Sequence, residues 1–217
     1  MITRAICITA LVLTTGCGAL GKDGLGASAL NRLGTLTGLK KAPPKAPPPV
    51  PTEALAKGPG HVLMVTLIGR NAVAPLTRVA RNGDTDTWRT AKGVTLSLKG
   101  DLLVASRGLN EDLMGADIDG VREVIGSGEG VAKRIHSYLD SEDQIRTRDL
   151  TCIITTAGPE EITTLAGKVE TVKVLENCTS TALVFKNTYW LDEIGGNIVQ
   201  SRQALAPTVG YIQVNPL

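Results

Sequence analysis

From His61 onward the chain consists of short segments in which apolar and polar residues alternate, and this pattern constrains the fold more than any other feature. Val62 to Ile68 is a strongly apolar first segment, and Gly93 to Leu98 alternates residue by residue. A period of two places successive side chains on opposite faces of a strand. Turn residues such as Asn82-Gly83 and Lys99-Gly100-Asp101 separate the segments. The pattern therefore predicts antiparallel hairpins.

The last hairpin is the clearest, with Thr181 to Leu191 and Ile198 to Leu205 joined across Gly195-Gly196. Both faces of its first strand carry apolar groups, so we expect both faces to be covered. About ten such strands and almost no helix predict an all-β fold, an antiparallel β-barrel or a barrel-like sandwich with one short helix. Closure of the sheet would remove its open edges.

Three local features mark the connections between strands. Asn110 can cap a short helix through Ala116, because Glu111 and Asp112 in its first turn favour the helix dipole. Gly126 to Gly130 lacks the Lys-Ser/Thr end and the following helix of a phosphate-binding loop, so we expect a flexible loop before the next strand. Gly158-Pro159 is expected to turn the chain between two further strands.

The N-terminus has the layout of a secretory signal peptide over residues 1–16. One positive side chain, Arg4, precedes the apolar run Ala5 to Leu13, which is too short for a spanning helix of about 20 residues. Small residues then lead directly to Cys17, the position that is diacylated in bacterial lipoprotein precursors. Such signals usually carry Leu three residues before the Cys, and Thr14 stands there instead. An ordinary signal peptide, with Cys17 incidental, is the alternative.

A lipid on Cys17 would fix where the protein resides. Each buried methylene contributes about 0.8 kcal/mol, and two or more chains give stable anchoring. Gly18 follows Cys17, in place of the Asp that retains many lipoproteins at the inner membrane. We therefore expect a lipid-anchored protein on the periplasmic face of the outer membrane, with no cofactor other than this covalent lipid.

Residues 17–60 are expected to form the lipidated Cys and a disordered tether, with the β-barrel-like domain over residues 61–217. Four glycines among Gly24 to Gly38 oppose a helix there. Lys40 to Pro51 is rich in Pro, whose fixed φ and missing N–H group favour an extended polyproline II spacer.

Composition excludes several classes of function. The net charge is +2 with interspersed signs, which gives no case for nucleic acid binding. Of the four cysteines, Cys7 and Cys17 lie in the signal region, so Cys152 and Cys178 remain for one disulfide in an oxidising compartment. Two buried thiols are the alternative. Neither histidine lies at ligand spacing from a Cys, so no metal site is predicted.

Several stretches follow one another along the chain: Thr87-Trp88-Arg89-Thr90, Leu103 to Met114, the Cys152 and Cys178 pair, Asn187 to Asp192, Ser201-Arg202-Gln203 and Gly210-Tyr211. In this order they resemble the YjbF/GfcB family of bacterial lipoproteins, which are encoded with exopolysaccharide or group 4 capsule export genes. The resemblance covers about residues 61–217. It implies a β-barrel-like periplasmic domain, an outer-membrane lipid anchor and a role in polysaccharide production or secretion. It carries no established catalytic residues.

The leading hypothesis is a non-catalytic accessory of polysaccharide export, whose partners are an outer-membrane export porin, a periplasmic companion and the polysaccharide itself. Arg107 is the first candidate binding residue, because its planar fork suits a carboxylate. A structural role at the turn, including a salt bridge to Asp112, is its alternative. The other candidates share this ambiguity between packing and binding: Trp88, Arg89, Trp190 and Arg202.

Two other classes of function are weighed against it. A polysaccharide lyase or hydrolase would need paired carboxylates across a cleft, or a base at His61 or His136. The acidic residues of the folded part stand in turn-like positions, and no nucleophile motif flanks a Ser, so no catalytic residue is assigned. A lipid or lipoprotein carrier, or another envelope-structural protein, is the remaining class, and a carrier would need an apolar cavity.

Overall fold

The structure is a computed structural model, and it describes residues 60–139, 144–164, 167–194 and 196–216 together with positions 49, 52, 56, 58 and 142. The expected signal peptide, Cys17 and nearly all of the tether lie outside these residues and stay predictions. Within the described residues, no helix is long and apolar enough to cross a membrane.

Twelve antiparallel strands form one sheet in the order β5-β4-β3-β2-β1-β12-β11-β10-β9-β8-β7-β6. The first half comprises β1 (Val62–Leu67), β2 (Ala72–Asn82), β3 (Thr85–Arg89), β4 (Thr95–Lys99), β5 (Leu102–Arg107) and β6 (Leu113–Asp117). The second comprises β7 (Gly130–Leu139), β8 (Ile145–Thr164), β9 (Gly167–Thr179), β10 (Val184–Asp192), β11 (Ile198–Ala206) and β12 (Gly210–Pro216). A 3₁₀ turn, η1 (Ile68–Arg70), joins β1 to β2, and the helix α3 (Val121–Ser127) joins β6 to β7.

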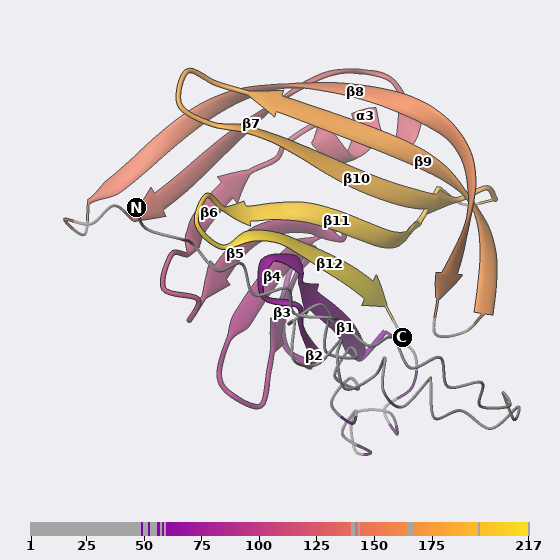
Figure 1. The fold of residues 1–217 in the computed structure, drawn as a ribbon, viewed down its shortest axis with the longest axis horizontal. Coiled ribbons are helices and arrows are strands. Elements are labelled where there is room, and N and C mark those ends of the chain that lie inside the picture. Colours follow the sequence, from indigo (N-terminus) through magenta and orange to yellow (C-terminus); the bar gives the residue numbers. More distant parts are fainter. Residues whose placement is uncertain are drawn as a thin grey trace, which may run out of the picture. The chain divides into compact units, whose positions relative to one another are not determined.

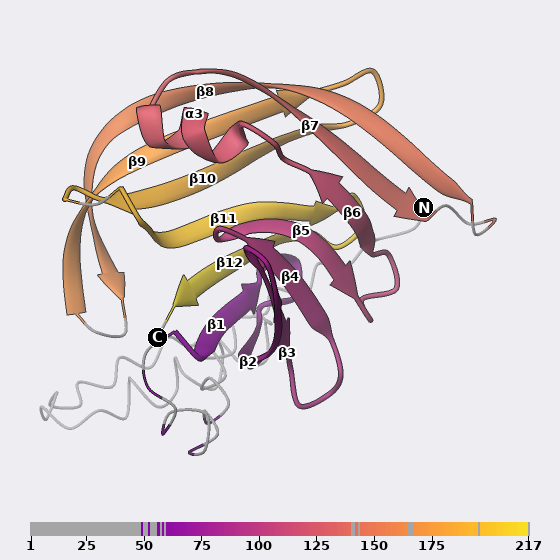
Figure 2. The same cartoon turned by 180° about the vertical axis from the view of Figure 1, so that it is seen from behind.

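The sheet curls into a nearly closed barrel (Figure 1). Each strand pairs with a neighbour in sequence, and the first strand, β1, pairs with the last, β12. The strands left at the two ends of the order are β5 and β6, and they lie next to each other when the barrel is seen from either side (Figure 2). The predicted all-β antiparallel barrel with one short helix is confirmed.

The predicted turns explain the tight hairpins. Asn82 pairs with Thr85 across Gly83-Asp84, and Lys99 pairs with Leu102 across Gly100-Asp101. Gly100 and Asp101 both have left-handed φ, 52° and 69°, as a two-residue type I′ hairpin turn requires. The twist of this turn matches that of the strands it joins.

The predicted helix at Asn110 to Ala116 is wrong, because the acidic residues there hold a loop. Asn110 has a left-handed φ of 81°, and Leu113–Asp117 is strand β6. The Asp112 carboxylate accepts the N–H groups of Gly108 and Leu109, at 2.8 and 3.3 Å. An acid that binds preceding amides closes a loop and leaves no helical first turn to stabilise.

The helix lies further along the chain, at α3, where a flexible loop was expected over Gly126 to Gly130. Gly126 and Ser127 form its last turn, and Gly128, with φ of 84°, caps it. A Cβ on Gly128 would lie 2.5 Å from the hydroxyl oxygen of Thr156, so only glycine fits there. Val121 and Ile125, four residues apart, bury α3 against the barrel interior. This spacing and the capping glycine are the signals that could have located the helix.

The turn expected at Gly158-Pro159 is also wrong, because β8 continues through it. The register shifts between Thr156 and Gly158, which marks a β-bulge that bends the strand. The pairing of β7 with β8 ends at Ile154, so in the described sheet this part of β8 pairs with β9 alone. Proline is tolerated where a strand has one free edge.

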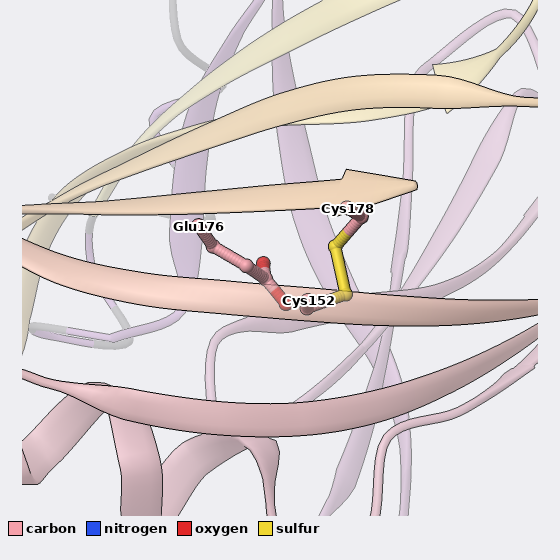
Figure 3. A group of neighbouring side chains, drawn as sticks. All are labelled: Cys152, Glu176 and Cys178. Atoms are coloured by element: carbon pink, nitrogen blue, oxygen red, sulfur yellow. A yellow bond between two sulfur atoms is a disulfide. The ribbon is translucent and has the colours of Figure 1, made fainter. Parts of the chain in front are cut away.

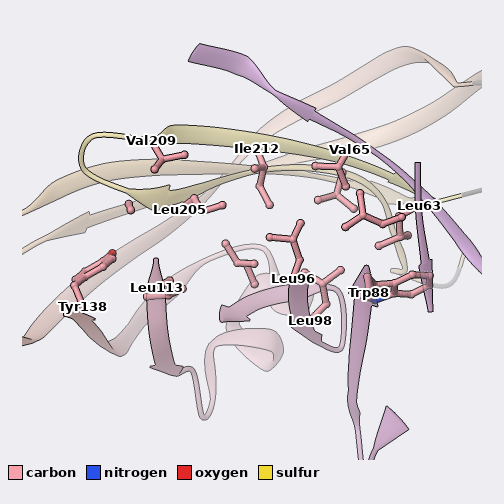
Figure 4. Packing of buried hydrophobic residues seen from close by; sticks show 14 residues of the cluster. Leu63, Val65, Trp88, Leu96, Leu98, Leu113, Tyr138, Leu205, Val209 and Ile212 are labelled. Atoms are coloured by element: carbon pink, nitrogen blue, oxygen red, sulfur yellow. The ribbon is translucent and has the colours of Figure 1, made fainter. Parts of the chain in front are cut away.

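Mainly aliphatic side chains fill the interior beside β1 to β5, β11 and β12 (Figure 4). Leu63, Leu76, Leu96, Leu205 and Ile212 are each no more than 2% exposed. At about 25 cal/mol per Å² of buried apolar surface, burial of this kind is the main stabilising term for the fold. We call this part of the interior the apolar half.

Candidate functional site

A buried ion pair occupies the interior between β7, β9 and β10. Arg134 Nε lies 2.6 Å from Glu176 Oε1, and Arg134 is 2% and Glu176 0% exposed. The second guanidinium nitrogen donates to Glu176 Oε2 and to the Tyr189 hydroxyl, each at 3.0 Å. Asn187 Nδ2 and Tyr189 Oη donate to the same Glu176 oxygen, at 2.7 and 2.8 Å. A buried charge is tolerated only when it is paired and hydrogen-bonded in this way.

These four residues, Arg134, Glu176, Asn187 and Tyr189, are called the polar half of the interior. Burial, and then the Glu176 carboxylate, raise the pKa of Tyr189 well above its ordinary value, so the phenol remains a neutral donor. Asn187 also accepts the backbone N–H of Ala204 on β11 at 2.8 Å. The polar half thus ties four strands together.

The predicted disulfide between Cys152 and Cys178 is confirmed. The two residues are direct register partners on β8 and β9, and both side chains are fully buried. Glu176 lies next to them, so the three side chains meet at the spacing of a metal site (Figure 3). The sulfurs are bonded to each other and the carboxylate is held by the polar half, so these groups do not provide the thiolate ligands that zinc needs.

His136 is buried beside the polar half and is 2% exposed. Its Nδ1 lies 2.9 Å from the Tyr138 hydroxyl, and its ring stacks on Phe185 with centroids 5.3 Å apart. Burial, and then the positive charge of Arg134, lower the pKa of His136 to about 3. The imidazole is therefore neutral and serves in packing.

Side chains close the seam between β5 and β6, where the described sheet has no backbone ladder. Arg107 donates from Nη1 to the carbonyls of Ser106 and Leu113, at 2.5 and 3.1 Å, and from Nη2 to that of Met114 at 3.0 Å. Ser106 Oγ donates to Asp112 at 2.8 Å and accepts the N–H of Leu113 at 3.0 Å. Arg107 therefore has a structural role at the seam, and ligand contact by it stays a prediction.

A second set of side-chain hydrogen bonds joins β11 to the β4–β5 hairpin through Gln203. Gln203 Oε1 accepts the N–H of Leu103 at 2.8 Å, and its Nε2 donates to the carbonyl of Asp101 at 2.9 Å. This N–H belongs to the edge strand β5, so the amide replaces a missing ladder bond. Sequence reasoning named Gln203 only within a family motif and did not single out Arg134 or Glu176, because the partners of all three lie far away in the chain.

The remaining candidate binding residues occupy different surroundings. Trp88 is 5% exposed and packs in the apolar half, while Arg89 is exposed at the end of β3. Trp190 is 9% exposed, with Lys173 Nζ 5.6 Å from its ring. Arg202 is exposed and lies over the Tyr211 ring at 5.0 Å. Trp190 and Arg202 are diagonal neighbours on one face of β10 and β11, and the structure does not gather all of these residues at one site.

Two cavities open at opposite ends of the barrel. The mouth cavity, of about 180 Å³, is lined by Glu111, Tyr138, Arg146, Arg148 and Leu183. The other, of about 220 Å³, lies near the α3 end and is lined by Asp84, Lys99, Asp119, Arg122 and Glu123. Arginines outnumber acids in the first, whereas acids outnumber bases in the second.

Comparison with known proteins gives the family. The model of the family described as group 4 capsule polysaccharide lipoprotein GfcB, YjbF matches residues 40–217. No curated protein sequence matches the chain. Among solved structures, the hypothetical lipoprotein YmcC from Escherichia coli K12 is similar in fold, with a TM-score of 0.63 and 18% identity over 72% of this chain and 82% of that one. Because the family model covers most of the sequence, the chain belongs to the YjbF family of group 4 capsule polysaccharide lipoproteins.

Proposed function

We propose that this chain is anchored to the periplasmic face of the outer membrane by lipid on Cys17 and acts as a non-catalytic accessory of exopolysaccharide or capsule production and export. Family membership supports the link to capsule polysaccharide and to lipoproteins. The Cys that follows an apolar run and small residues supports the anchor. Its partners in this proposal are an export porin of the outer membrane and a periplasmic companion.

The observation that supports a non-catalytic role most directly is that the candidate catalytic groups have structural partners. Asp112 closes the β5–β6 loop, and Asp192 accepts the Asn197 side-chain amide at 3.0 Å. His136 is buried and neutral, and His61 lies 3.3 Å from the guanidinium of Arg78. A glycosidase would instead place two carboxylates about 5–10 Å apart across a cleft.

The composition of the interior argues against an acyl-chain carrier. The Arg134–Glu176 pair occupies part of the barrel interior. An acyl chain could take this space only by displacing the network, and buried polar groups without partners cost several kcal/mol. The cavities described above lie instead at the two ends of the barrel.

A strain that lacks this gene tests the proposed function. We expect loss of surface polysaccharide with retained synthesis of the repeat units, and recovery when the wild-type chain is restored. Cys17→Ser should leave the protein out of the outer-membrane fraction and restore export poorly. Normal surface polysaccharide in the deletion strain would contradict the role in export, and an unchanged membrane fraction for Cys17→Ser would contradict the anchor.

Partner identity needs a separate measurement. Photo-crosslinking from exposed positions of the barrel in living cells, followed by extraction in detergent, should join the chain to an outer-membrane export protein. The same positions on the Cys17→Ser variant give the matched control. Crosslinks that do not depend on Cys17 would place the partner away from the membrane.

A further inference from the structure

The mouth cavity contains two arginines that face the inside of the barrel. On β8 the buried residues Leu150, Cys152 and Ile154 alternate with exposed ones, so every even-numbered residue of this stretch faces inward. Arg146 and Arg148 continue this row to the end of the strand, and both line the mouth cavity. Their register partners on β7 are the inward-facing Tyr138 and His136.

The Arg148 guanidinium in this cavity has donors that the acid sharing the cavity does not use. Within the described residues, the guanidinium of Arg148 donates only to the carbonyl of Thr147, at 3.2 Å, although it carries five N–H donors. The Glu111 carboxylate instead accepts two hydrogen bonds from Thr208, from its backbone N–H at 2.8 Å and from its hydroxyl. Arg146 lines the same cavity. Arg148 therefore offers unused donors to the cavity.

We propose that the mouth cavity binds an acidic sugar residue of the polysaccharide, with its carboxylate on Arg148. The inference rests on the proposed function. A planar guanidinium fork matches a carboxylate through two parallel hydrogen bonds. The ring of Tyr138 and the side chain of Leu183 provide apolar surface for the carbon face of the sugar.

The size and position of the mouth cavity limit which ligands it can bind. Its volume of about 180 Å³ is below the roughly 300–1,000 Å³ of drug-sized sites, so it holds one sugar residue and leaves the rest of a polymer outside. Pro207 of the β11–β12 turn lines it, whereas β1 begins beside Pro216 at the far end of β12. The segment that precedes β1 thus joins the barrel at the end opposite the mouth cavity.

Calorimetric titration of the full-length chain, extracted in detergent, tests the proposal. The probes are a glucuronate trisaccharide, a glucose trisaccharide of equal length, and inorganic phosphate. We expect the glucuronate trisaccharide alone to bind, with an affinity that falls as salt is added. Arg148→Gln should weaken it at least about tenfold, because hydrogen bonds to a charged group are the strong ones. Arg148→Lys keeps the charge and loses the planar fork, so its affinity should lie between those of the wild type and Arg148→Gln.

Lys133→Gln is the matched control, because it removes one positive charge from the exposed face of the same hairpin. It should bind like the wild type, and the thermal unfolding of each variant reports whether the barrel is intact. Equal binding of the glucose trisaccharide, equal binding of phosphate, or full affinity in a folded Arg148→Gln variant would each overturn the site. None of these results would alter the export phenotype of the deletion strain, so the site can fail while the proposed function stands.

Discussion

On one side of the barrel, β1 to β5, β11 and β12 meet through mainly aliphatic side chains, whereas on the other side β7, β9 and β10 enclose an ion pair among their apolar contacts. Leu76, in the apolar half, and Glu176, in the polar half, are equally inaccessible, at 1% and 0% exposure. Aliphatic contact has no preferred direction, so a side chain of similar volume can replace another. An ion pair in the interior requires one partner in one place.

The difference teaches what each half contributes to the fold. The apolar half contributes transfer free energy, as do two further buried clusters beside β7 to β11, and the polar half fixes the register of β7 to β10. A slip of one residue on β9 would turn Glu176 to the outside and leave Arg134 buried without a counter-charge. The disulfide two residues away from Glu176 holds the same register covalently.

Glu176→Gln should have the largest effect, a loss of about 3–5 kcal/mol in the free energy of unfolding, although the side chain keeps its shape. The reason is that Arg134 stays charged in a dry interior with no carboxylate to neutralise it. Urea unfolding of the purified full chain measures the loss. The double variant Arg134→Met, Glu176→Leu removes both charges and should be more stable than Glu176→Gln; a double variant at least as unstable would show that the charge is not the cause.

Leu76 provides the corresponding measurement in the apolar half. Leu76→Ala should cost about 3 kcal/mol, because it leaves a cavity among buried side chains. Leu76→Met conserves volume and should cost less than about 1.5 kcal/mol. The comparison between the halves fails if the shape-conserving change at Leu76 costs as much as the one at Glu176 in the same urea titration.

The apolar half and the turns were readable from the sequence because their signals are local. The alternation of Thr95 to Leu98 and the Lys99-Gly100-Asp101 turn specify a hairpin within a few residues. The YjbF resemblance, carried by motifs along the chain, was confirmed over residues 40–217. Closure of the barrel also followed, since a long antiparallel meander needs some way to protect its edges.

The polar half was not predicted, because its pairs are long-range. Arg134 and Glu176 are 42 positions apart, and each stands in an alternating strand where a charged residue ordinarily faces water. Gln203 meets Leu103 across 100 positions. The helix predicted from Asn110 was wrong for another reason. A capping residue followed by acids is typical of a helix start, and it is equally compatible with a loop closed by a carboxylate.

Arg107 tests whether the seam depends on side chains, and its effect should be smaller than either core change. Arg107→Gln removes its hydrogen bonds to the carbonyls of Leu113 and Met114 across the seam, and we expect a loss of about 2 kcal/mol. Arg202→Gln, an exposed arginine over an aromatic ring, is the control and should lose no more than about 1 kcal/mol.

Hydrogen exchange distinguishes a local opening of the seam from a general loss of stability. The amides of Gly108 and Leu113 should exchange faster in Arg107→Gln, while those of β1 and β12 should keep their protection relative to global unfolding. Normal surface polysaccharide with this variant at wild-type protein levels would remove Arg107 from the candidate ligand-binding residues.

The smallest effect concerns pH and His136, which borders the polar half. Its pKa is about 3 in the folded chain and ordinarily 6.5, so the unfolded chain takes up the proton first as the pH falls. The stability that depends on neutral His136 is therefore complete above pH 6.5 and is lost progressively down to about pH 3. Between pH 7 and 5.5 the free energy of unfolding should fall by about 1.3 kcal/mol through this residue.

His136→Phe isolates the contribution of His136 to the pH dependence of stability, because phenylalanine can keep the stack on Phe185 and cannot titrate. Urea unfolding at both pH values should show a smaller decrease for the variant, by about 1.3 kcal/mol. An identical decrease in both proteins would mean that water reaches His136 in the folded barrel. The polar half would then be a hydrated interior, and the contrast with the apolar half would rest on water access as well as on charge.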